Sequence, residues 1–433
     1  MSDARYTAVK LLCKTFSGGS FSNIQLNNGL KKSGLEERDK KLCSLIYYGV
    51  IERKIYLDYI IEKFSSRPLK KLDDVILNIL RCGIYQLMFA ENIPESAVVN
   101  ESVTLARKFG KKSASGMVNA VLRNFIRQGK KVQLPDEKYK RYSIEYSAPP
   151  EFTESLVNDY GEELAVNLLA DSLGSPPVTV RMNPLKCTEQ EFISALGNIK
   201  AVKNEIIPEC YSLSGDVTNT EAFRKGYFHV QDLASQLCCE SLAPSENDVV
   251  LDICSAPGGK AFTMAEIMHG KGKIMAFDLH QKRVELIRSG AERLGLTNIY
   301  ADTGDALKFN PDLPQFDKIL CDVPCSGLGA VRRKPEIKYK NFDDFSCLPD
   351  IQYNIAENAL NYLKTGGEMV YSTCTLRKAE NEYIIEKLLS VHKELEPVQL
   401  PEPLGERFGS MVSIFPCYFG SDGFFIAKLR KVR

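Results

Sequence analysis

VVLDICSAPGGK (249–260) is the stretch that decides the fold of this 433-residue chain. It joins a short apolar run to a glycine-rich turn, and a helical pattern follows. Continuous apolar runs of this length are typical of buried parallel strands. Glycines at the turn let the backbone approach a ligand closely, and the N-terminus of the following helix favours an anionic group. The stretch therefore predicts the first strand and the ligand-binding turn of a doubly wound sheet.

Further apolar runs alternate with helical segments downstream of this stretch. The runs that we expect to be parallel strands are KIMAFD (273–278), NIYADTGDA (298–306), DKILCDV (317–323) and EMVYSTC (368–374). Such alternation predicts an α/β, Rossmann-like domain with a mostly parallel sheet. The last two runs, MVSIFP (411–416) and GFFIAKL (423–429), are expected to form a hairpin at its edge.

The residues before this domain divide into two further regions, so the multidomain chain has three expected domains. Residues 1–135 predict an all-α bundle, because apolar residues recur there at the spacing of one helix face. The apolar stripes are Val9, Leu12, Cys13 and Phe16, then Ile76, Ile79, Leu80, Gly83 and Leu87, then Val118, Val121, Leu122 and Phe125. Residues 136–231 predict a small α/β connecting domain with a strand at 178–181, and residues 232–433 predict the Rossmann-like domain.

Charge is distributed unevenly along the chain. Residues 1–140 hold 25 Lys+Arg and 14 Asp+Glu, whereas the rest hold 31 and 41, so the net charge of +1 hides a basic first region. The segment 102–135 has no acidic residue and includes Arg107, Lys111 and Lys112. Long blocks of one sign indicate a polyanionic partner such as RNA, although a solvated helical face is the alternative for any such run.

No apolar stretch approaches the ~18 residues of a membrane span, and the start MSDARYTAVK lacks the apolar core of a signal peptide. We therefore expect a cytoplasmic, monomeric protein without a membrane partner. Its 13 cysteines are then expected to be reduced. No pair of C-x-x-C motifs is present and the four histidines are scattered, so we expect no metal site.

Acidic residues accompany two of the expected strands. Asp278 ends the second strand and Asp305 follows the third. A carboxylate at such a strand end can accept hydrogen bonds from both ribose hydroxyls of a nucleoside cofactor. The turn is not a G-x-G-x-x-G fingerprint, and these features leave the cofactor open between a dinucleotide and S-adenosylmethionine. The turn residues expected to hold it are Cys254, Ser255, Ala256, Pro257, Gly258, Gly259 and Lys260.

Two cysteines lie at the ends of the next two expected strands. CDVPCSGLG (321–329) places Asp322 and Cys325 after one strand, and YSTCT (371–375) places Cys374 after the other. Ligands of open α/β sheets bind at the carboxyl ends of strands, so these side chains should converge on the cofactor crevice. A single cysteine is more often an inert core residue, but this pair indicates thiol chemistry.

The combination of APGGK (256–260), DVPCSGLG (322–329), STCT (372–375) and DGFF (422–425) resembles the RNA cytosine-5 methyltransferases of the NOL1/NOP2/Sun family. The first region resembles a NusB-like domain in RDKKLCSLIYYGV (38–50), LRCGIYQLMF (80–89), PESAVVNESV (94–103) and GMVNAVLRN (116–124). That fusion is similar to the bacterial 16S ribosomal RNA (cytosine-5)-methyltransferases of the RsmB (Sun/Fmu) type. The resemblance covers nearly the whole chain.

The resemblance implies S-adenosylmethionine as the cofactor, S-adenosylhomocysteine as its product, 16S ribosomal RNA as the substrate, and no metal. It implies that Cys374 adds to carbon 6 of a cytosine, which makes carbon 5 able to attack the sulfonium methyl. Asp322 would bind ring nitrogen 3 and the amino group of the base, beside the cofactor. Cys325 would help to release the product from its covalent adduct, and Lys260 could steady Asp322 or the cofactor carboxylate.

Contacts to RNA follow more loosely from the same resemblance. Arg181 and Asn183 match a family R-x-N element, and Gln231 and Asp232 lie in a family segment that could frame the pocket. For all four, local capping or a domain-interface contact is the alternative. The target base must be single-stranded or flipped out before a thiol can reach it.

Three other functions could use the same sheet or bundle. An NAD-type oxidoreductase requires a dinucleotide glycine fingerprint, which is absent, and gives the paired cysteines no role. A non-catalytic RNA-binding or antitermination factor would not need Asp322, Cys325 and Cys374. An amino-group methyltransferase would need no nucleophilic cysteine. The cysteine pair therefore favours methylation of carbon 5.

Overall fold

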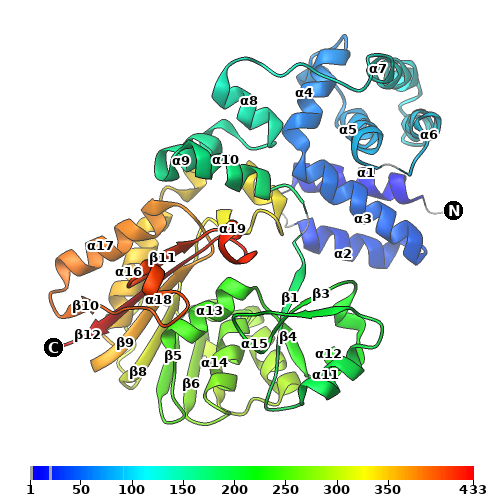
Figure 1. Cartoon of the computed structure of the whole chain (residues 1–433). Coiled ribbons are helices and arrows are strands. Elements are labelled where there is room, and N and C mark those ends of the chain that lie inside the picture. Colours follow the sequence, from blue (N-terminus) through cyan, green and yellow to red (C-terminus); the bar gives the residue numbers. More distant parts are fainter. Residues whose placement is uncertain (1–2, 19–21, 91, 175) are drawn as a thin grey trace. The chain divides into compact units, whose positions relative to one another are not determined.

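The computed structural model describes residues 3–18, 22–90, 92–174 and 176–433 (Figure 1). The chain divides into two compact units, each described separately below. The helical unit comprises residues 1–174 together with 331–340, and the sheet unit comprises residues 175–330 and 341–433. The finer division into three domains, at residues 135 and 231, stays a prediction.

The helical unit is built around α5 (Asp74–Phe89), which is buried on nearly all sides and packs against α1, α3, α4, α6 and α7. Its other helices are α1 (Ala4–Ser17), α2 (Ser22–Ser33), α3 (Glu37–Glu52), α4 (Lys54–Phe64), α6 (Glu95–Lys108), α7 (Ser115–Arg127), α8 (Lys138–Glu145), α9 (Pro150–Tyr160) and α10 (Glu162–Asp171), with short 3₁₀ turns at Leu69–Lys71 and Lys112–Ala114. A largely apolar helix such as α5 is typical of the inside of a bundle. The predicted stripes are buried in the bundle core, except that Cys13 and Phe16 are only partly buried.

The segment 331–340 belongs to the helical unit although it lies in the second half of the chain. It forms a 3₁₀ turn at Pro335–Tyr339, in which Lys338 is 1% exposed. The Lys338 ammonium donates to the carbonyl of Glu52 at 2.8 Å, and the Tyr339 hydroxyl donates to the same oxygen at 3.1 Å. Burial lowers the pKa of Lys338 to about 7.

The sheet unit contains a larger sheet whose strand order is β10-β12-β9-β8-β5-β6-β7, with β11 paired to β12. Its strands are β5 (Val249–Asp252), β6 (Lys273–Asp278), β7 (Ile299–Thr303), β8 (Phe316–Asp322), β9 (Leu363–Thr373), β10 (Leu395–Pro397), β11 (Met411–Ile414) and β12 (Phe424–Lys431). Strands β5 to β9 pair in parallel, and β12 runs antiparallel to β9. The predicted hairpin of β11 and β12 is confirmed, but β12 lies inside the sheet because it also pairs with β9.

Helices cover both faces of this sheet (Figure 1). The sheet unit contains α13 (Leu233–Leu242), α14 (Gly259–Ile267), α15 (Gln281–Leu294), α16 (Leu348–Leu360), α17 (Glu382–Val391), α18 (Gly405–Phe408) and α19 (Pro416–Phe419), with 3₁₀ turns at Leu328–Ala330, Phe342–Phe345 and Lys378–Glu380. Val250 packs with residues of α13, α14 and α15, whereas its neighbour Leu251 packs with residues of α16 and α17. This alternation explains why the strands are apolar throughout, and the predicted fold class is confirmed.

A smaller antiparallel sheet, of order β2-β3-β1-β4, precedes the larger one. Its elements are β1 (Val178–Met182), β2 (Ala201–Lys203), β3 (Cys210–Leu213), β4 (Phe228–Val230), α11 (Glu189–Leu196), α12 (Glu221–Arg224) and a 3₁₀ turn at Val217–Asn219. The strand predicted at 178–181 is confirmed as β1.

Candidate active site

The strand order of the larger sheet reverses between β5 and β8, since β6 and β7 extend one side and β9 extends the other. Ligands of open α/β sheets bind at the carboxyl ends of the strands at such a switch point. The loops that follow β5, β8 and β9 carry Ser255, Cys325 and Cys374. The structure thus brings together the loops that the sequence assigned to one crevice.

The glycine turn after β5 has a conformation that depends on Gly258. This residue has φ +104°, and a Cβ atom on it would lie 2.6 Å from the Phe262 ring. The turn is joined to β6 by a hydrogen bond from the Ser255 amide to the carbonyl of Phe277 (2.7 Å). Helix α14 starts at the next residue, and its first amides have no intrahelical partner. The turn therefore offers backbone donors to an anionic group.

A pocket of about 200 Å³ lies against this turn, lined by residues that include Gln231, Asp252, Ser255, Gly259, Lys260 and Asp322. Neither carboxylate oxygen of Asp252, which is 1% exposed, has a hydrogen bond of good geometry from the described residues. Burial raises the pKa of Asp252 to about 7, and the nearby Ser255 hydroxyl offsets part of that rise. The Ser255 hydroxyl and the Gln231 Nε2 are also buried without a partner in the described part of the chain.

Unpartnered buried polar groups are costly, so this cluster indicates that a polar ligand completes the pocket. The ligand would carry a cation for Asp252 and an acceptor for Ser255, Gln231 and the start of α14. An α-amino acid end, with its ammonium and carboxylate, meets both requirements.

Asp322 ends β8 beside this pocket and is held from two sides. Lys260 Nζ donates to its Oδ2 at 2.8 Å, and the Ser372 hydroxyl donates to its Oδ1 at 2.7 Å. Burial alone would lower the pKa of Lys260, but the Asp322 carboxylate holds that pKa above its ordinary value. Lys260 thus remains a cation, and it fixes the Asp322 side chain in the crevice.

The two cysteines face each other with their sulfur atoms 3.1 Å apart. The hydrogen bond to Cys374 and burial raise the pKa of the Cys325 thiol well above its ordinary value. Either sulfur can be the donor in this contact, so the assignment of attack to Cys374 and of release to Cys325 stays a prediction from the family resemblance. Burial also raises the pKa of Cys254 above its ordinary value, which fits a packing role.

A second pocket, of about 210 Å³, lies beside the ends of β6 and β7 and is lined by residues that include Phe277, Gly304, Asp305, Ala306 and Phe309. Its mostly apolar lining suits a flat aromatic ring. Asp305 accepts from the Leu307 amide at 3.1 Å.

Asp278, at the end of β6, is buried and already has protein partners. It accepts from the His280 amide (3.1 Å) and pairs with Arg283 (3.0 Å), whose other nitrogen donates to the carbonyl of Ala256. A carboxylate has about four acceptor sites, so Asp278 retains capacity for a ribose hydroxyl.

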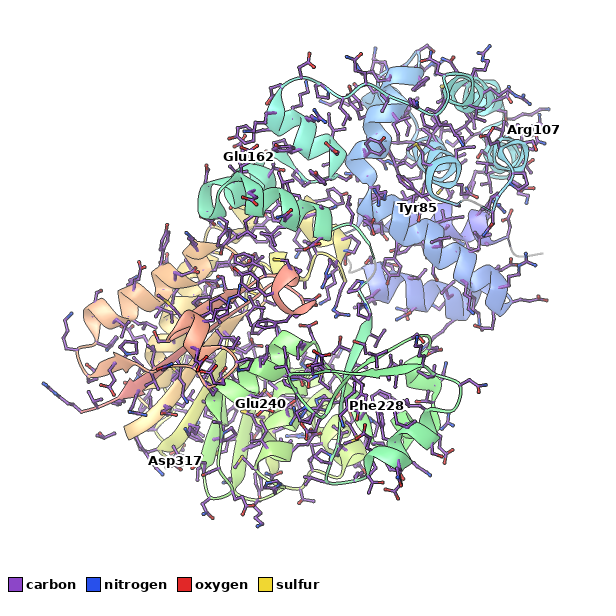
Figure 2. The ribbon with its side chains drawn as sticks, in the orientation of Figure 1. Tyr85, Arg107, Glu162, Phe228, Glu240 and Asp317 are labelled. Carbon is purple, nitrogen blue, oxygen red and sulfur yellow. The ribbon has the colours of Figure 1, made fainter. Side chains whose placement is uncertain are left out.

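The structure places Arg181 and Asn183 inside the protein. Arg181 is 3% exposed and pairs with Glu266 (3.0 Å) and with Glu240 (3.1 Å), which is labelled in Figure 2. Asn183 is fully buried and donates to the carbonyl of Leu294. This placement favours the structural alternative for both residues over contact with RNA.

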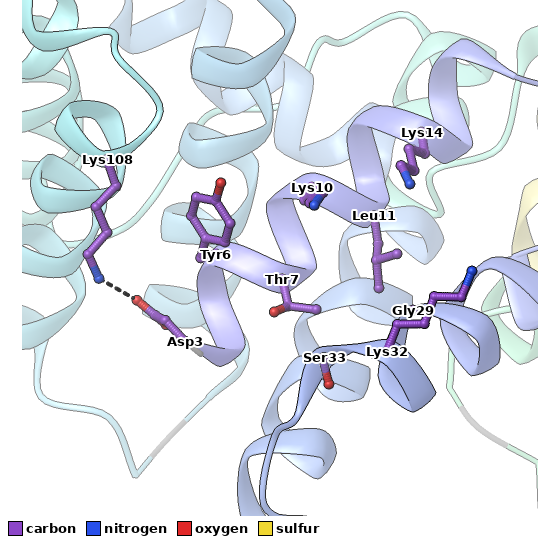
Figure 3. Close-up of a pocket in the computed structure, with 10 residues that line it drawn as sticks. All are labelled: Asp3, Tyr6, Thr7, Lys10, Leu11, Lys14, Gly29, Lys32, Ser33 and Lys108. Atoms are coloured by element: carbon purple, nitrogen blue, oxygen red, sulfur yellow. Dashed lines mark hydrogen bonds and ion pairs between the residues drawn. The ribbon is translucent and has the colours of Figure 1, made fainter. Parts of the chain in front are cut away.

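The basic residues of the helical unit are more accessible. Arg107, labelled in Figure 2, and Lys112 are exposed, while Lys111 pairs with Asp73. A cavity of about 480 Å³ in the same unit is lined by Lys10, Lys14, Lys32 and Lys108, and Figure 3 shows Lys108 paired with Asp3 at its edge. Lys10, Lys14 and Lys32 lie outside the acid-free segment 102–135, whereas Lys108 lies within it.

Sequence reasoning missed Asp252, which it counted as part of a strand, and the buried residues Glu380 and Asn381 after Cys374. A buried carboxylate without a partner can be recognised only from the fold. The run ENE (380–382) was a weak signal, because charged side chains in a loop are ordinarily solvated.

The part of the chain that the structure describes holds neither a cluster of metal ligands nor a membrane-spanning helix. Among the residues described, no group of three or more His, Cys, Asp or Glu side chains is placed to hold a metal ion. No helix within the described ranges is both long and apolar enough to cross a membrane.

Comparison with known proteins connects both units to described families. The family described as 16S rRNA methyltransferase RsmB/F matches residues 239–430, and the NusB family matches residues 2–127. The probable ribosomal RNA small subunit methyltransferase B of Bacillus subtilis is 35% identical over 99% of both chains. A relative of the same name from Synechocystis sp. is 33% identical over the full length of both.

A solved structure agrees at the level of the fold. The crystal structure of the protein PH0851 has a TM-score of 0.84 and 24% identity, and covers 99% of this chain and 98% of its own. The identity and coverage of the curated relatives confirm the resemblance found in the sequence. The chain belongs to the ribosomal RNA small subunit methyltransferase B family.

Proposed function

We propose that this protein methylates carbon 5 of a cytosine in 16S ribosomal RNA, with S-adenosylmethionine as the methyl donor and a covalent cysteine–cytosine adduct on the way. The observation that supports carbon 5 is the pair of thiols 3.1 Å apart beside Asp322. Methylation of an amino group would leave that pair without a task. The family of its relatives supports ribosomal RNA as the substrate.

The residues of the crevice fit the cofactor. Asp252 would bind its ammonium, and Ser255, Gln231 and the first amides of α14 would bind its carboxylate. Asp278 would accept the ribose hydroxyls, and the pocket beside Asp305 would enclose the adenine ring. When bound, the cofactor supplies an electrophilic methyl group.

The protein's own residues then act on the base. Cys374 Sγ forms a bond to carbon 6, and the electron pair of the C5–C6 double bond becomes available at carbon 5 for the methyl group. Asp322, fixed by Lys260 and Ser372, would accept a hydrogen bond from the amino group. It would also pass the proton of the Cys374 thiol to ring nitrogen 3, which neutralises the negative charge that the addition creates there. Carbon 5 then bears both a methyl group and a proton.

Release requires that the proton leave carbon 5. Its electron pair restores the double bond, while the Sγ–C6 electrons return to Cys374. We assign Cys325 to this step, because its Sγ lies 3.1 Å from Cys374 Sγ. The Cys325 thiol proton can pass to Cys374 as that sulfur leaves, and the Cys325 thiolate so formed can take the proton from carbon 5.

Substitution of each cysteine separates the two steps. Cys374→Ala should form no covalent bond to RNA and should not turn over, because the nucleophile is absent. Cys325→Ala should keep the nucleophile but retain methylated RNA as a thioether. A denaturing gel with labelled RNA should show a shifted band for Cys325→Ala alone, and none for the double variant.

A shifted band for Cys374→Ala would show that the two roles are exchanged. Full activity in both variants would discard covalent catalysis. Nucleoside analysis of the product distinguishes 5-methylcytidine from an amino-methylated base, and bisulfite sequencing of RNA from a deletion strain identifies the target.

A further inference from the structure

Glu380 ends the 3₁₀ turn that follows Cys374, Asn381 comes directly after that turn, and both side chains are fully buried. A buried carboxylate is tolerated only when it is paired and hydrogen-bonded. The partners of Glu380 and Asn381 are the two loops that carry the cysteines, and the chemistry above assigns neither residue a task.

Glu380 holds the loop of Cys325. Its Oε2 accepts from the Ser326 amide (2.9 Å) and from Gln352 Nε2 (2.9 Å). Gln352 Nε2 also donates to the carbonyl of Pro324 at 2.9 Å. The backbone is thus fixed on both sides of Cys325. Arg377 donates to the other carboxylate oxygen at 2.9 Å, and the two side chains form a partly buried ion pair.

Asn381 holds the loop of Cys374. Its Oδ1 accepts from the Thr373 hydroxyl (2.6 Å), and its Nδ2 donates to the carbonyl of Thr375 (3.0 Å). The carbonyl of Cys374 itself accepts from the Gly329 amide at 3.0 Å. A Cβ atom on Gly329 would lie 2.0 Å from the carbonyl oxygen of Gly423, so this close approach requires glycine.

We propose that Glu380 and Asn381 are positioning residues that act on different halves of the catalytic cycle. Asn381 places Cys374 for attack on carbon 6, and Glu380 places Cys325 for release of the product. This inference rests on the proposed function. The two sulfur atoms lie 3.1 Å apart and act on the same base. A small displacement of the Cys374 loop should therefore slow attack more than release, and a displacement of the Cys325 loop should slow release more than attack.

The test compares Glu380→Gln and Asn381→Ala in the full chain. Glu386→Gln and Asn354→Ala, at exposed positions on α17 and α16, are the matched controls. Each protein is mixed with ordinary RNA and with RNA that carries 5-fluorocytidine at the target. Fluorine leaves no proton to remove from carbon 5 after methylation, so the rate of adduct formation on the fluorinated RNA reports attack and not release.

Glu380→Gln should form the adduct on fluorinated RNA at the rate of the parent protein. On ordinary RNA it should accumulate RNA-linked protein, and its turnover should fall by about ten- to a hundredfold, the usual effect of a misplaced group. Asn381→Ala should form the adduct on fluorinated RNA more slowly by a similar factor. It should not accumulate RNA-linked protein on ordinary RNA. The control variants should behave like the parent.

Equal slowing of attack by both variants would overturn the inference, because it would indicate one shared effect on the fold. Unchanged rates in both would overturn it as well. Should either variant fail to fold, Gln352→Met and Thr373→Val remove the partners of Glu380 and Asn381 and carry the same two expectations.

The Cys325→Ala and Cys374→Ala proteins distinguish failure of this inference from failure of the proposed function. If Cys325→Ala traps RNA but Glu380→Gln does not, the positioning role is wrong and covalent catalysis stands. If Cys325→Ala and the parent protein on fluorinated RNA both fail to trap, the covalent mechanism is wrong, and the positioning role falls with it.

Discussion

Asp252 is the residue whose environment most specifically requires a cationic group on the cofactor. Its carboxylate is buried, its pKa is raised to about 7 by burial, and no described residue gives it a hydrogen bond of good geometry. A ligand ammonium favours the ionised form, so affinity should fall as the pH drops through about 7. Asp252→Asn should weaken S-adenosylhomocysteine binding by about 1–3 kcal/mol above that pH. Calorimetry between about pH 5.5 and 7.5, below the α-amino pKa, should show a pH dependence only in the parent. Equal slopes in both proteins would mean that Asp252 does not meet the ammonium.

Single residues also show which parts of the site could be predicted from the sequence. Asp322, Cys325 and Cys374 could be placed in one crevice beforehand, because strand ends in a parallel sheet share an edge. Arg181 matched a motif, but its burial against Glu266 depends on how β1 packs on α14, which no motif encodes. The roles of Glu380 and Asn381 depend on loops that only the folded chain brings together.

Among the secondary-structure elements, the 3₁₀ turn Pro335–Tyr339 contains the buried Lys338, whose charge should lower the stability of the fold. Lys338 has a folded-state pKa of about 7, caused by burial, well below its unfolded value of about 10.4. Between these values the unfolded chain binds more protons, so the contribution of this group to stability rises with pH. Below about pH 7 Lys338 is charged in the folded and in the unfolded chain, so the full free-energy cost of burying the ammonium is present. Lys338→Met should therefore raise the melting temperature by a few degrees at pH 6.5 or so, and the gain should shrink toward about pH 10. Scanning calorimetry of the full chain measures this, with exposed Lys71→Met as the control. A gain that is the same at every pH would contradict the assigned cause.

Long elements were easier to predict than short ones. Strands β5, β6, β8 and β9 coincide with continuous apolar runs, a pattern that is typical of buried strands. Strands of three residues, such as β2 and β10, are too short for a period to appear. The position of the turn Pro335–Tyr339 could not be predicted, because Lys338 meets a carbonyl 286 residues away in sequence.

For the entire chain, the distribution of basic charge decides how RNA would be held. The acid-free segment led us to expect contacts at Arg107, Lys111 and Lys112, of which Lys111 is paired with Asp73. The cavity lined by Lys10, Lys14 and Lys32 adds a second concentration of positive charge on α1 and α2 (Figure 3). Deleting the first 130 residues would also remove Glu52, the partner of Lys338, so the effect of lost charge would be mixed with that of a disturbed segment.

Point substitutions avoid that difficulty. Replacement of Lys10, Lys14 and Lys32 by Gln should weaken RNA binding and flatten its salt dependence, because fewer counterions are released from the phosphates. Each lost contact should reduce the slope of log K against log salt by about 0.7–0.9, so three contacts should reduce it by about 2–3. Cofactor affinity should not change, since the three lysines lie in the helical unit and Asp252 lies in the sheet unit. Replacement of Lys41, Lys70 and Lys71, which are exposed in the helical unit and absent from the cavity lining, removes the same net charge and serves as the control. Equal slopes for the two triple variants would show that net charge, and not the cavity, accounts for the binding.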